Sequence, residues 1–276
     1  MTTLALIAIF SSAVFHAAWN ALLKKTSDPA AASVVIVFGA ASLTVLLAIF
    51  TGQAHVTSVG LPWLVATGLI EGLYFVTLSV ALARLPLGTA YGISRGAGLL
   101  MVWPLSILLF HEVLDWRSGM GALLLGAGLL ALVQGVGSLR GLAGAAGCAV
   151  AIALYPLGYK RALLAGIDPY PLFAISLGLA LPVQLALLRT DRVARLGAAW
   201  RRDRSRLSLA AALCAASFLL FLVALQKNGP GRVTALRNSS VLFATLFGWW
   251  GGDRISARTA SSAVLVAAGA VLLSWS

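Results

Sequence analysis

The sequence predicts an all-α integral membrane protein whose ten transmembrane helices form two inverted five-helix repeats. Three observations support this fold: the composition, the spacing of the apolar runs, and short motifs that recur in the second half of the chain. Of the 276 residues, 60% are hydrophobic and only 10% are charged, and the mean hydropathy is +0.96. A soluble domain carries about 25% charged residues. Nearly the whole chain is therefore expected to lie in a lipid bilayer.

Ten apolar runs follow one another along the chain. Each is close to the roughly 20 residues that a helix needs to cross the ~30 Å hydrocarbon layer of a bilayer. The connections are short, except for the basic stretch 189–206, which is expected to be a loop. The runs cover residues 4–23, 31–50, 61–83, 87–110, 118–139, 142–159, 169–188, 207–226, 233–250 and 257–275.

Short motifs of the first half recur in the second half, in the same order. The first run of each half ends in a basic pair, Lys24-Lys25 and Lys160-Arg161, and the fourth run of each half carries an arginine near its start, Arg95 and Arg237. Five spans is an odd number, so a second half of five spans enters the membrane inverted. The predicted repeats are residues 1–139 and 140–276, with a binding site expected at the membrane midplane between them.

The net charge is +12, and most of the basic residues lie in short gaps between apolar runs. This distribution is typical of the loops of a membrane protein. No recognition motif for nucleic acid accompanies them, so nucleic acid is not a predicted partner. Thirteen Lys and Arg lie on the side of the membrane that carries residues 189–206, and five lie on the other side. By the positive-inside rule the first side is cytoplasmic, which places both termini outside. Seven arginines in one stretch decide this count.

No catalytic or metal-binding motif is present, so the sequence predicts neither an enzyme nor a cofactor. Nucleophile elbows, phosphate-binding loops and zinc-protease motifs are all missing. The three histidines, His16, His55 and His111, lack metal spacing, and Cys148 and Cys214 lie inside apolar runs. The cysteines are therefore expected to be small buried hydrophobic residues.

Arg95 is the one charged residue in the apolar run 87–110. It lies about 12 Å along that helix, well inside the hydrocarbon layer. Arginine at a membrane centre costs at least ~2.5–3.5 kcal/mol, so such a residue usually faces a cavity or a partner. Arg95 is expected either to bind a carboxylate or phosphate of a ligand or to neutralise Glu71, and Tyr91 and Ser94 lie within one turn of it.

Arg237 lies only about 6 Å into its apolar run, so its side chain is expected to extend towards the membrane interface. Asn238 beside it is expected to line the same cavity as Arg95. In the third run, Glu71 is the one acidic residue near the middle of a span, and Tyr74 shares its face. Two interpretations of Glu71 remain open: a structural ion pair with Arg95 or Arg237, and a carboxylate that couples transport to protons or cations.

Polar residues recur every four positions in the first run, at Ser12, His16, Asn20 and Lys24. This spacing places them in one stripe on a helix. The stripe is either a helix contact face, since small and polar residues join membrane helices, or one wall of a polar cavity. Tyr155 in the sixth run is expected to line the same path.

Three motifs make the chain similar to a known family. They are Phe15-His-Ala-Ala-Trp-Asn-Ala-Leu-Leu-Lys24, Ala81-Leu-Ala-Arg-Leu-Pro-Leu-Gly88 and Phe110-His-Glu112. With the ten spans, they resemble the drug/metabolite transporter superfamily and its EamA-type permeases. The resemblance implies a bacterial inner-membrane carrier for small metabolites, often an exporter of amino acids or related compounds, that works by alternating access. It also implies cytoplasmic termini, the reverse of the charge count.

The combined hypothesis is a monomeric secondary transporter whose central cavity is bounded by spans 1, 3, 4, 6, 8 and 9. A small molecule and coupling protons are its predicted partners. Two alternatives remain open: a flippase for a lipid-linked substrate, which needs a lateral opening, and a non-transporting membrane partner or sensor, in which Glu71 packs against Arg95 with no cavity between the halves. The candidate substrate-binding residues are His16, Trp19, Asn20, Glu71, Tyr74, Tyr91, Ser94, Arg95, Tyr155, Arg237 and Asn238.

Overall fold

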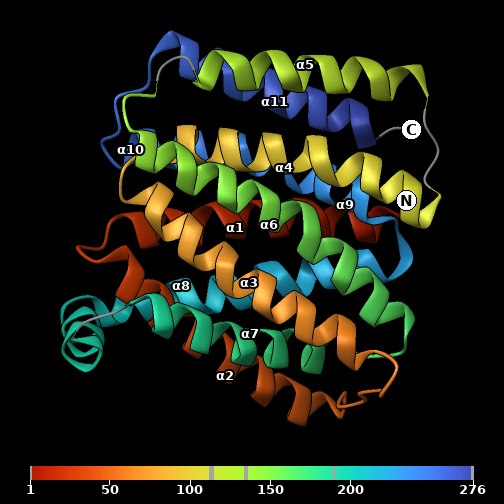
Figure 1. The fold of residues 1–276 in the computed structure, drawn as a ribbon, viewed down its shortest axis with the longest axis vertical. Coiled ribbons are helices and arrows are strands. Elements are labelled where there is room, and N and C mark those ends of the chain that lie inside the picture. The colour runs from red at the N-terminus through yellow and green to blue at the C-terminus, as the bar shows by residue number, and fades with distance from the viewer. Residues whose placement is uncertain (1, 112–114, 134–135, 189–190, 275–276) are drawn as a thin grey trace.

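The computed structural model describes residues 2–111, 115–133, 136–188 and 191–274, and all regular secondary structure in this part of the chain is helical. Glu112, the last residue of one family motif, lies outside it. Figure 1 shows helices that run roughly parallel, with the start of α1 and the end of α11 at the same end of the bundle. The helices are α1 (Thr3–Lys24), α2 (Pro29–Thr51), α3 (Leu61–Leu82), α4 (Leu87–Phe110), α5 (Trp116–Val133), α6 (Leu139–Leu164), α7 (Pro169–Leu187), α8 (Arg192–Lys227), α9 (Pro230–Arg237), α10 (Ser240–Trp250) and α11 (Ala257–Ser274).

Seven of the described helices are long and apolar enough to cross a membrane: α1, α2, α3, α4, α6, α7 and α8. Two shorter apolar segments, Gly119–Val133 and Ala257–Leu273, belong to α5 and α11. The ninth predicted span is divided into α9 and α10. These findings confirm an all-α membrane protein.

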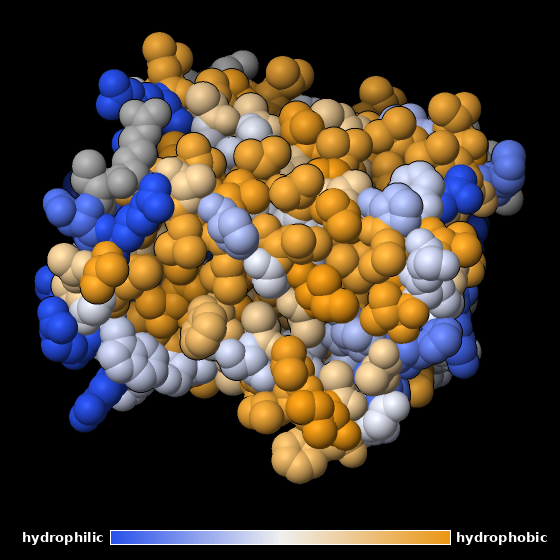
Figure 2. All heavy atoms as spheres, turned by 60° about the horizontal axis from the view of Figure 1, so that its bottom comes forward, coloured by the Kyte–Doolittle hydropathy of each residue, from blue (hydrophilic) through white to orange (hydrophobic). Residues whose placement is uncertain are grey.

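The outer surface is apolar, as contact with lipid requires. Large hydrophobic side chains such as Phe38, Phe50, Leu108 and Val264 are exposed. In Figure 2, hydrophobic residues cover the middle of the visible face and hydrophilic residues gather at its two sides. An exposed apolar surface of this extent marks a membrane-facing protein. The charged side chains of Glu71, Arg95 and Arg237 lie inside instead, which reverses the arrangement of a soluble protein.

Two parts of the chain differ from the predicted runs. The basic stretch expected as a loop is the first part of α8, which starts at Arg192 and contains one non-helical residue, Asp203 (φ −127°, ψ 24°). Its alanine, leucine and arginine residues are strong helix formers, which explains why it is helical. The run 233–250 breaks at Asn238 and Ser239, where the Val241 amide bonds to the Asn238 carbonyl in a tight turn. Asn238, Ser239 and Ser240 have lower intrinsic helix propensities than alanine and leucine, so a break is less costly there.

The two halves of the chain interdigitate rather than forming separate domains. Helix α1 packs against α8 as α6 packs against α3, and α2 packs against α7 and α8 as α7 packs against α2 and α3. Helices α5 and α11 pack against each other along one edge, at the top of Figure 1. Each of these contacts has a counterpart when the first half is exchanged for the second.

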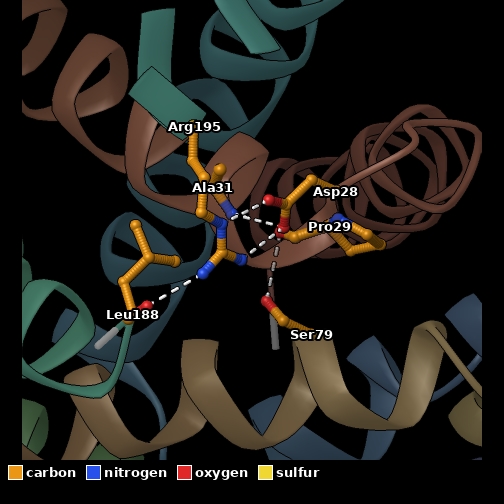
Figure 3. A network of polar contacts seen from close by, with 6 residues as sticks. All are labelled: Asp28, Pro29, Ala31, Ser79, Leu188 and Arg195. Atoms are coloured by element: carbon orange, nitrogen blue, oxygen red, sulfur yellow. Dashed lines mark hydrogen bonds and ion pairs between the residues drawn. The ribbon is translucent and has the colours of Figure 1, made fainter. Parts of the chain in front are cut away.

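An ion pair joins the connection between α1 and α2 to the start of α8 (Figure 3). The Arg195 guanidinium donates to both oxygens of Asp28, at 2.7 and 2.9 Å, and to the Leu188 carbonyl at 2.8 Å. Asp28 also accepts from the Ala31 amide at 3.1 Å and so caps α2. Donation from Arg195 holds the pKa of the Asp28 carboxyl below its usual value.

We expect Asp28→Asn to lower the free energy of unfolding by about 1 kcal/mol at pH 7, because both side chains are about one-third exposed. A depressed folded-state pKa stabilises the protein above the unfolded value and loses that effect as the pH falls through the folded value. The difference in melting temperature between wild type and Asp28→Asn should therefore shrink below about pH 4. Asparagine keeps the cap on α2, and a double-mutant cycle with Arg195→Gln isolates the pair. A difference that stays constant from pH 7 to pH 3 would contradict this origin.

Candidate functional site

Six helices place polar side chains at one point in the interior. We call these residues the central cluster; each is at least 99% buried. The helices are α1, α3, α4, α6, α8 and α9, the six spans predicted to bound a cavity. The members of the central cluster are His16, Tyr74, Arg95, Tyr155, Ser217 and Arg237.

His16 is the hub of the central cluster, because both of its ring nitrogens contact other members. Its Nε2 lies 3.1 Å from the Tyr74 hydroxyl and also contacts Arg95 Nη2. Its Nδ1 lies 2.8 Å from Arg237 Nη2 and 3.3 Å from Ser217 Oγ. One imidazole therefore lies between two guanidinium groups that come from opposite halves of the chain.

The backbone around His16 and Arg95 is fixed by neighbouring side chains. The Tyr91 hydroxyl and Asn20 Nδ2 donate to the His16 carbonyl, at 2.9 and 2.8 Å. Asn238 Nδ2, at the break between α9 and α10, donates to the Arg95 carbonyl at 2.9 Å. These contacts bind α1, α4 and the α9–α10 break into one unit.

Arg237 lies in the interior, so the prediction that it extends to the membrane interface is wrong. It is the last residue of α9, and its guanidinium carbon lies 4.4 Å from the ring centroids of Phe218 and Phe221 on α8. Its Nη2 donates to Ser217 Oγ at 3.0 Å and its Nη1 to the Tyr155 hydroxyl at 3.4 Å. The break after Arg237 accounts for the error, since the estimate of its depth assumed one straight helix over the whole run.

Glu71 forms no ion pair with either arginine. Within the described part of the chain, no carboxylate oxygen lies within 4.0 Å of the Arg95 or Arg237 guanidinium. Instead, Ser176 of α7 donates to Glu71 Oε2 at 2.7 Å, and the Tyr159 hydroxyl donates to Ser176 Oγ at 3.4 Å. The interpretation of Glu71 as one partner of a structural ion pair is therefore wrong. Its hydrogen bond to Ser176 instead links α3 to α7.

The remaining predicted residues surround the central cluster or bond elsewhere. The Trp19 indole donates to His16 Nδ1 at 3.4 Å, whereas Ser94 donates to the Ala90 carbonyl of its own helix at 2.7 Å. In the polar stripe of α1, the Ser12 hydroxyl donates to the Ser217 carbonyl at 2.7 Å and Lys24 donates to the Leu85 carbonyl at 2.8 Å. The stripe is thus a contact face along part of its length and a wall of the central cluster at His16.

Sequence reasoning missed the residues that α8 contributes: Ser217, Phe218 and Phe221. A signal for Ser217 exists, since it is an isolated hydroxyl in the apolar stretch from Ala215 to Leu225. The two phenylalanines carry no such signal, because an aromatic residue in a span is ordinary. As for metals, the described residues contain no group of three or more His, Cys, Asp or Glu side chains that would hold an ion.

Comparisons with known proteins agree with this architecture. Residues 139–275 match the model of the EamA-like transporter family, and residues 33–125 match that of the Small Multidrug Resistance protein. Matches are found to 27 chains of solved structures. One of them, a crystal structure of a protein, superposes with a TM-score of 0.70 at 18% identity and covers 99% of this chain and 96% of its own.

At that identity the structural match shows the fold alone, and the family matches carry the assignment. They fall on both halves of a multi-pass helical membrane protein, and the match to residues 33–125 includes the motifs at 81–88 and 110–112. The chain is therefore an EamA-type membrane transporter of the drug/metabolite transporter superfamily.

Proposed function

We propose that the protein is a monomeric secondary transporter of the bacterial inner membrane that exports a small metabolite by alternating access. Amino acids and related compounds are the first substrate class to test. The observation that carries the proposal is the central cluster, in which both halves of the chain direct charged side chains at one buried point. Charged residues inside a membrane protein usually mark a substrate or ion pathway.

The proposal includes ten spans in two inverted repeats, residues 1–139 and 140–276. Equivalent lysines support it: Lys24 of α1 donates to the Leu82 and Leu85 carbonyls at the end of α3, and Lys160 of α6 donates to the Leu225 and Gln226 carbonyls at the end of α8. The reciprocal packing of the helices also agrees with this symmetry. Inverted halves that meet at a central site are the usual basis of alternating access.

The two ends of the bundle carry related contacts, which suits a transporter that opens at one end at a time. At one end Asp28, which precedes Pro29 of α2, pairs with Arg195. At the other, Asp168, which precedes Pro169 of α7, accepts from the His55 amide at 3.0 Å. In our proposal, each contact closes its end and breaks when that end opens.

Glu71 is the proposed proton-coupling residue. It is fully buried, and its Oε1 has no hydrogen-bond partner. The titratable and charged groups that interact with it are Tyr159 on α6, Cys214 on α8 and Arg237 on α9. Glu71 and Arg95 are not paired, so one of the two observations that would favour a non-transporting partner or sensor is missing.

Flux into proteoliposomes tests the proposal. Protein reconstituted into vesicles is screened by counterflow against radiolabelled amino acids, organic acids, sugars and nucleosides. We expect saturable exchange of at least one class and none in vesicles without protein. Absence of exchange for every class, by protein that is folded and correctly inserted, would contradict a transport function for small metabolites.

A further inference from the structure

We infer that the central cluster binds an oxyanion of the substrate, a carboxylate or a phosphate-type group, which bridges Arg95 and Arg237 and displaces the His16 ring from between them. The inference rests on the proposed transport function and names the substrate class of the same site. Three observations carry it: a deficit of acceptors at His16, unpartnered donors on both arginines, and the absence of a carboxylate beside them in the described chain.

The acceptor deficit follows from the chemistry of imidazole. Arg95 Nη2 and the Tyr74 hydroxyl contact Nε2, while Arg237 Nη2 and the Trp19 indole N–H contact Nδ1. A neutral imidazole has one acceptor nitrogen and one N–H, and a charged imidazolium has no acceptor. At least one guanidinium therefore faces an N–H group in place of an acceptor.

Both guanidinium groups also have N–H donors without a hydrogen-bond partner. Arg95 Nη1 and Arg237 Nε are buried and have no hydrogen-bond partner. The acceptors that Arg237 does have, Ser217 and Tyr155, are neutral hydroxyls. Buried arginine is ordinarily paired with an anion, because an uncompensated charge in a protein interior is costly. The central cluster lacks this anion, and a substrate oxyanion supplies it.

The geometry of a bridging oxyanion suits these donors. A carboxylate or phosphate presents two or more oxygens, and guanidinium groups bind such pairs of oxygens through parallel N–H bonds. An oxyanion of similar width that takes the place of the imidazole is within reach of both guanidinium groups. The His16 ring then donates from one nitrogen to the bound oxygen or to Tyr74.

Unpartnered acceptors near the central cluster indicate a donor elsewhere on the same substrate. Asn20 Oδ1 and Asn238 Oδ1 are buried without a partner, while the amide nitrogens of both residues bond to the backbone of the two central-cluster helices α1 and α4. An ammonium or hydroxyl group adjacent to the oxyanion satisfies such oxygens. This favours an amino acid or hydroxy acid over a simple fatty acid.

Ligand-induced changes in melting temperature test the inference on purified full-length protein in detergent. The probes are glutamate, succinate and inorganic phosphate, with glucose as a neutral control and putrescine as a cationic control. We expect at least one anionic probe to raise the melting temperature in a saturable manner and both controls to leave it unchanged. Stabilisation by putrescine or glucose alone would overturn the inference.

Variants separate a binding role from a structural one. Arg95→Gln and Arg237→Gln should each weaken binding of the effective anion at least tenfold, and their ligand-free melting temperatures should equal or exceed that of wild type, because each removes unpartnered buried donors. Arg204→Gln, which changes an exposed arginine on α8, is the matched control and should bind normally. Variants that melt earlier yet keep the anion response would show that the arginines are structural, and this would overturn the inference.

Two further arms separate this inference from the proposed function and identify the source of the oxyanion. Saturable anion binding without flux in proteoliposomes contradicts transport but supports the anion site. Flux of a neutral compound that no anion inhibits supports transport but contradicts the anion site. A response to short-chain phosphatidate, with none to the soluble anions, supports an oxyanion site that holds a lipid headgroup.

Discussion

Glu71→Gln is expected to uncouple transport from the pH gradient while substrate exchange continues. Glutamine has nearly the same shape as glutamate and can still accept from Ser176 through its amide oxygen, so the link between α3 and α7 is retained. The glutamine side chain cannot bind and release a proton as a carboxylate does. A gradient of one pH unit supports about tenfold accumulation if one proton accompanies each substrate molecule, because tenfold corresponds to about 1.4 kcal/mol. The wild type should approach that ratio and Glu71→Gln should reach equal concentrations.

The measurement compares two assays on the same vesicles, accumulation under an imposed pH gradient and counterflow without one. Glu71→Gln should lose the first and keep the second. Asp191→Asn is a control that removes an exposed carboxyl just before α8, outside the proposed gating contacts, and it should retain gradient-driven accumulation. If Glu71→Gln still accumulates substrate in proportion to the pH gradient, proton coupling through this residue is wrong.

The helical fold was predictable because the bilayer sets the length of an apolar span. The observed helices α1, α3 and α4 begin and end within one residue of the predicted runs 4–23, 61–83 and 87–110. Burial of Arg95 was also predictable, since a charge in an apolar run must face the protein interior. Both arguments depend only on local composition, which the chain displays directly.

The contacts inside the bundle depended on information that local composition lacks. The position of Arg237 requires the break after α9, and the three polar residues 238–240 favour such a break without fixing how the two short helices then lie. The partner of Glu71 is Ser176, a hydroxyl 105 residues away on α7, which no charge argument selects. Electrostatic complementarity suggested an arginine, whereas packing placed α7 beside α3.

Gly269→Ala is expected to destabilise the pairing of α5 with α11. A Cβ atom on Gly269 would lie 2.5 Å from the Gly121 carbonyl oxygen and 2.8 Å from the Leu125 amide nitrogen. Both are backbone atoms that cannot turn aside, so the helices must separate. Overpacking of this kind costs about 1–3 kcal/mol. Gly126→Ala on α5 is the matched control, because a Cβ there meets nothing within 4 Å, and it should leave the melting temperature unchanged or slightly raised.

The consequence should extend to the central cluster, because α5 packs against α4 and α11 packs against both α4 and α9, the helices that carry Arg95 and Arg237. Small residues let membrane helices approach closely, and the closely packed pair of α5 and α11 supports α4 and α9 on the side of the bundle where this pair lies. Gly269→Ala should therefore lower the melting temperature and also weaken anion binding, whereas Gly126→Ala should change neither adversely. Equal melting temperatures for the two alanine variants would show that the α5–α11 contact relaxes without cost. The α5–α11 pair would then not be what positions the arginines.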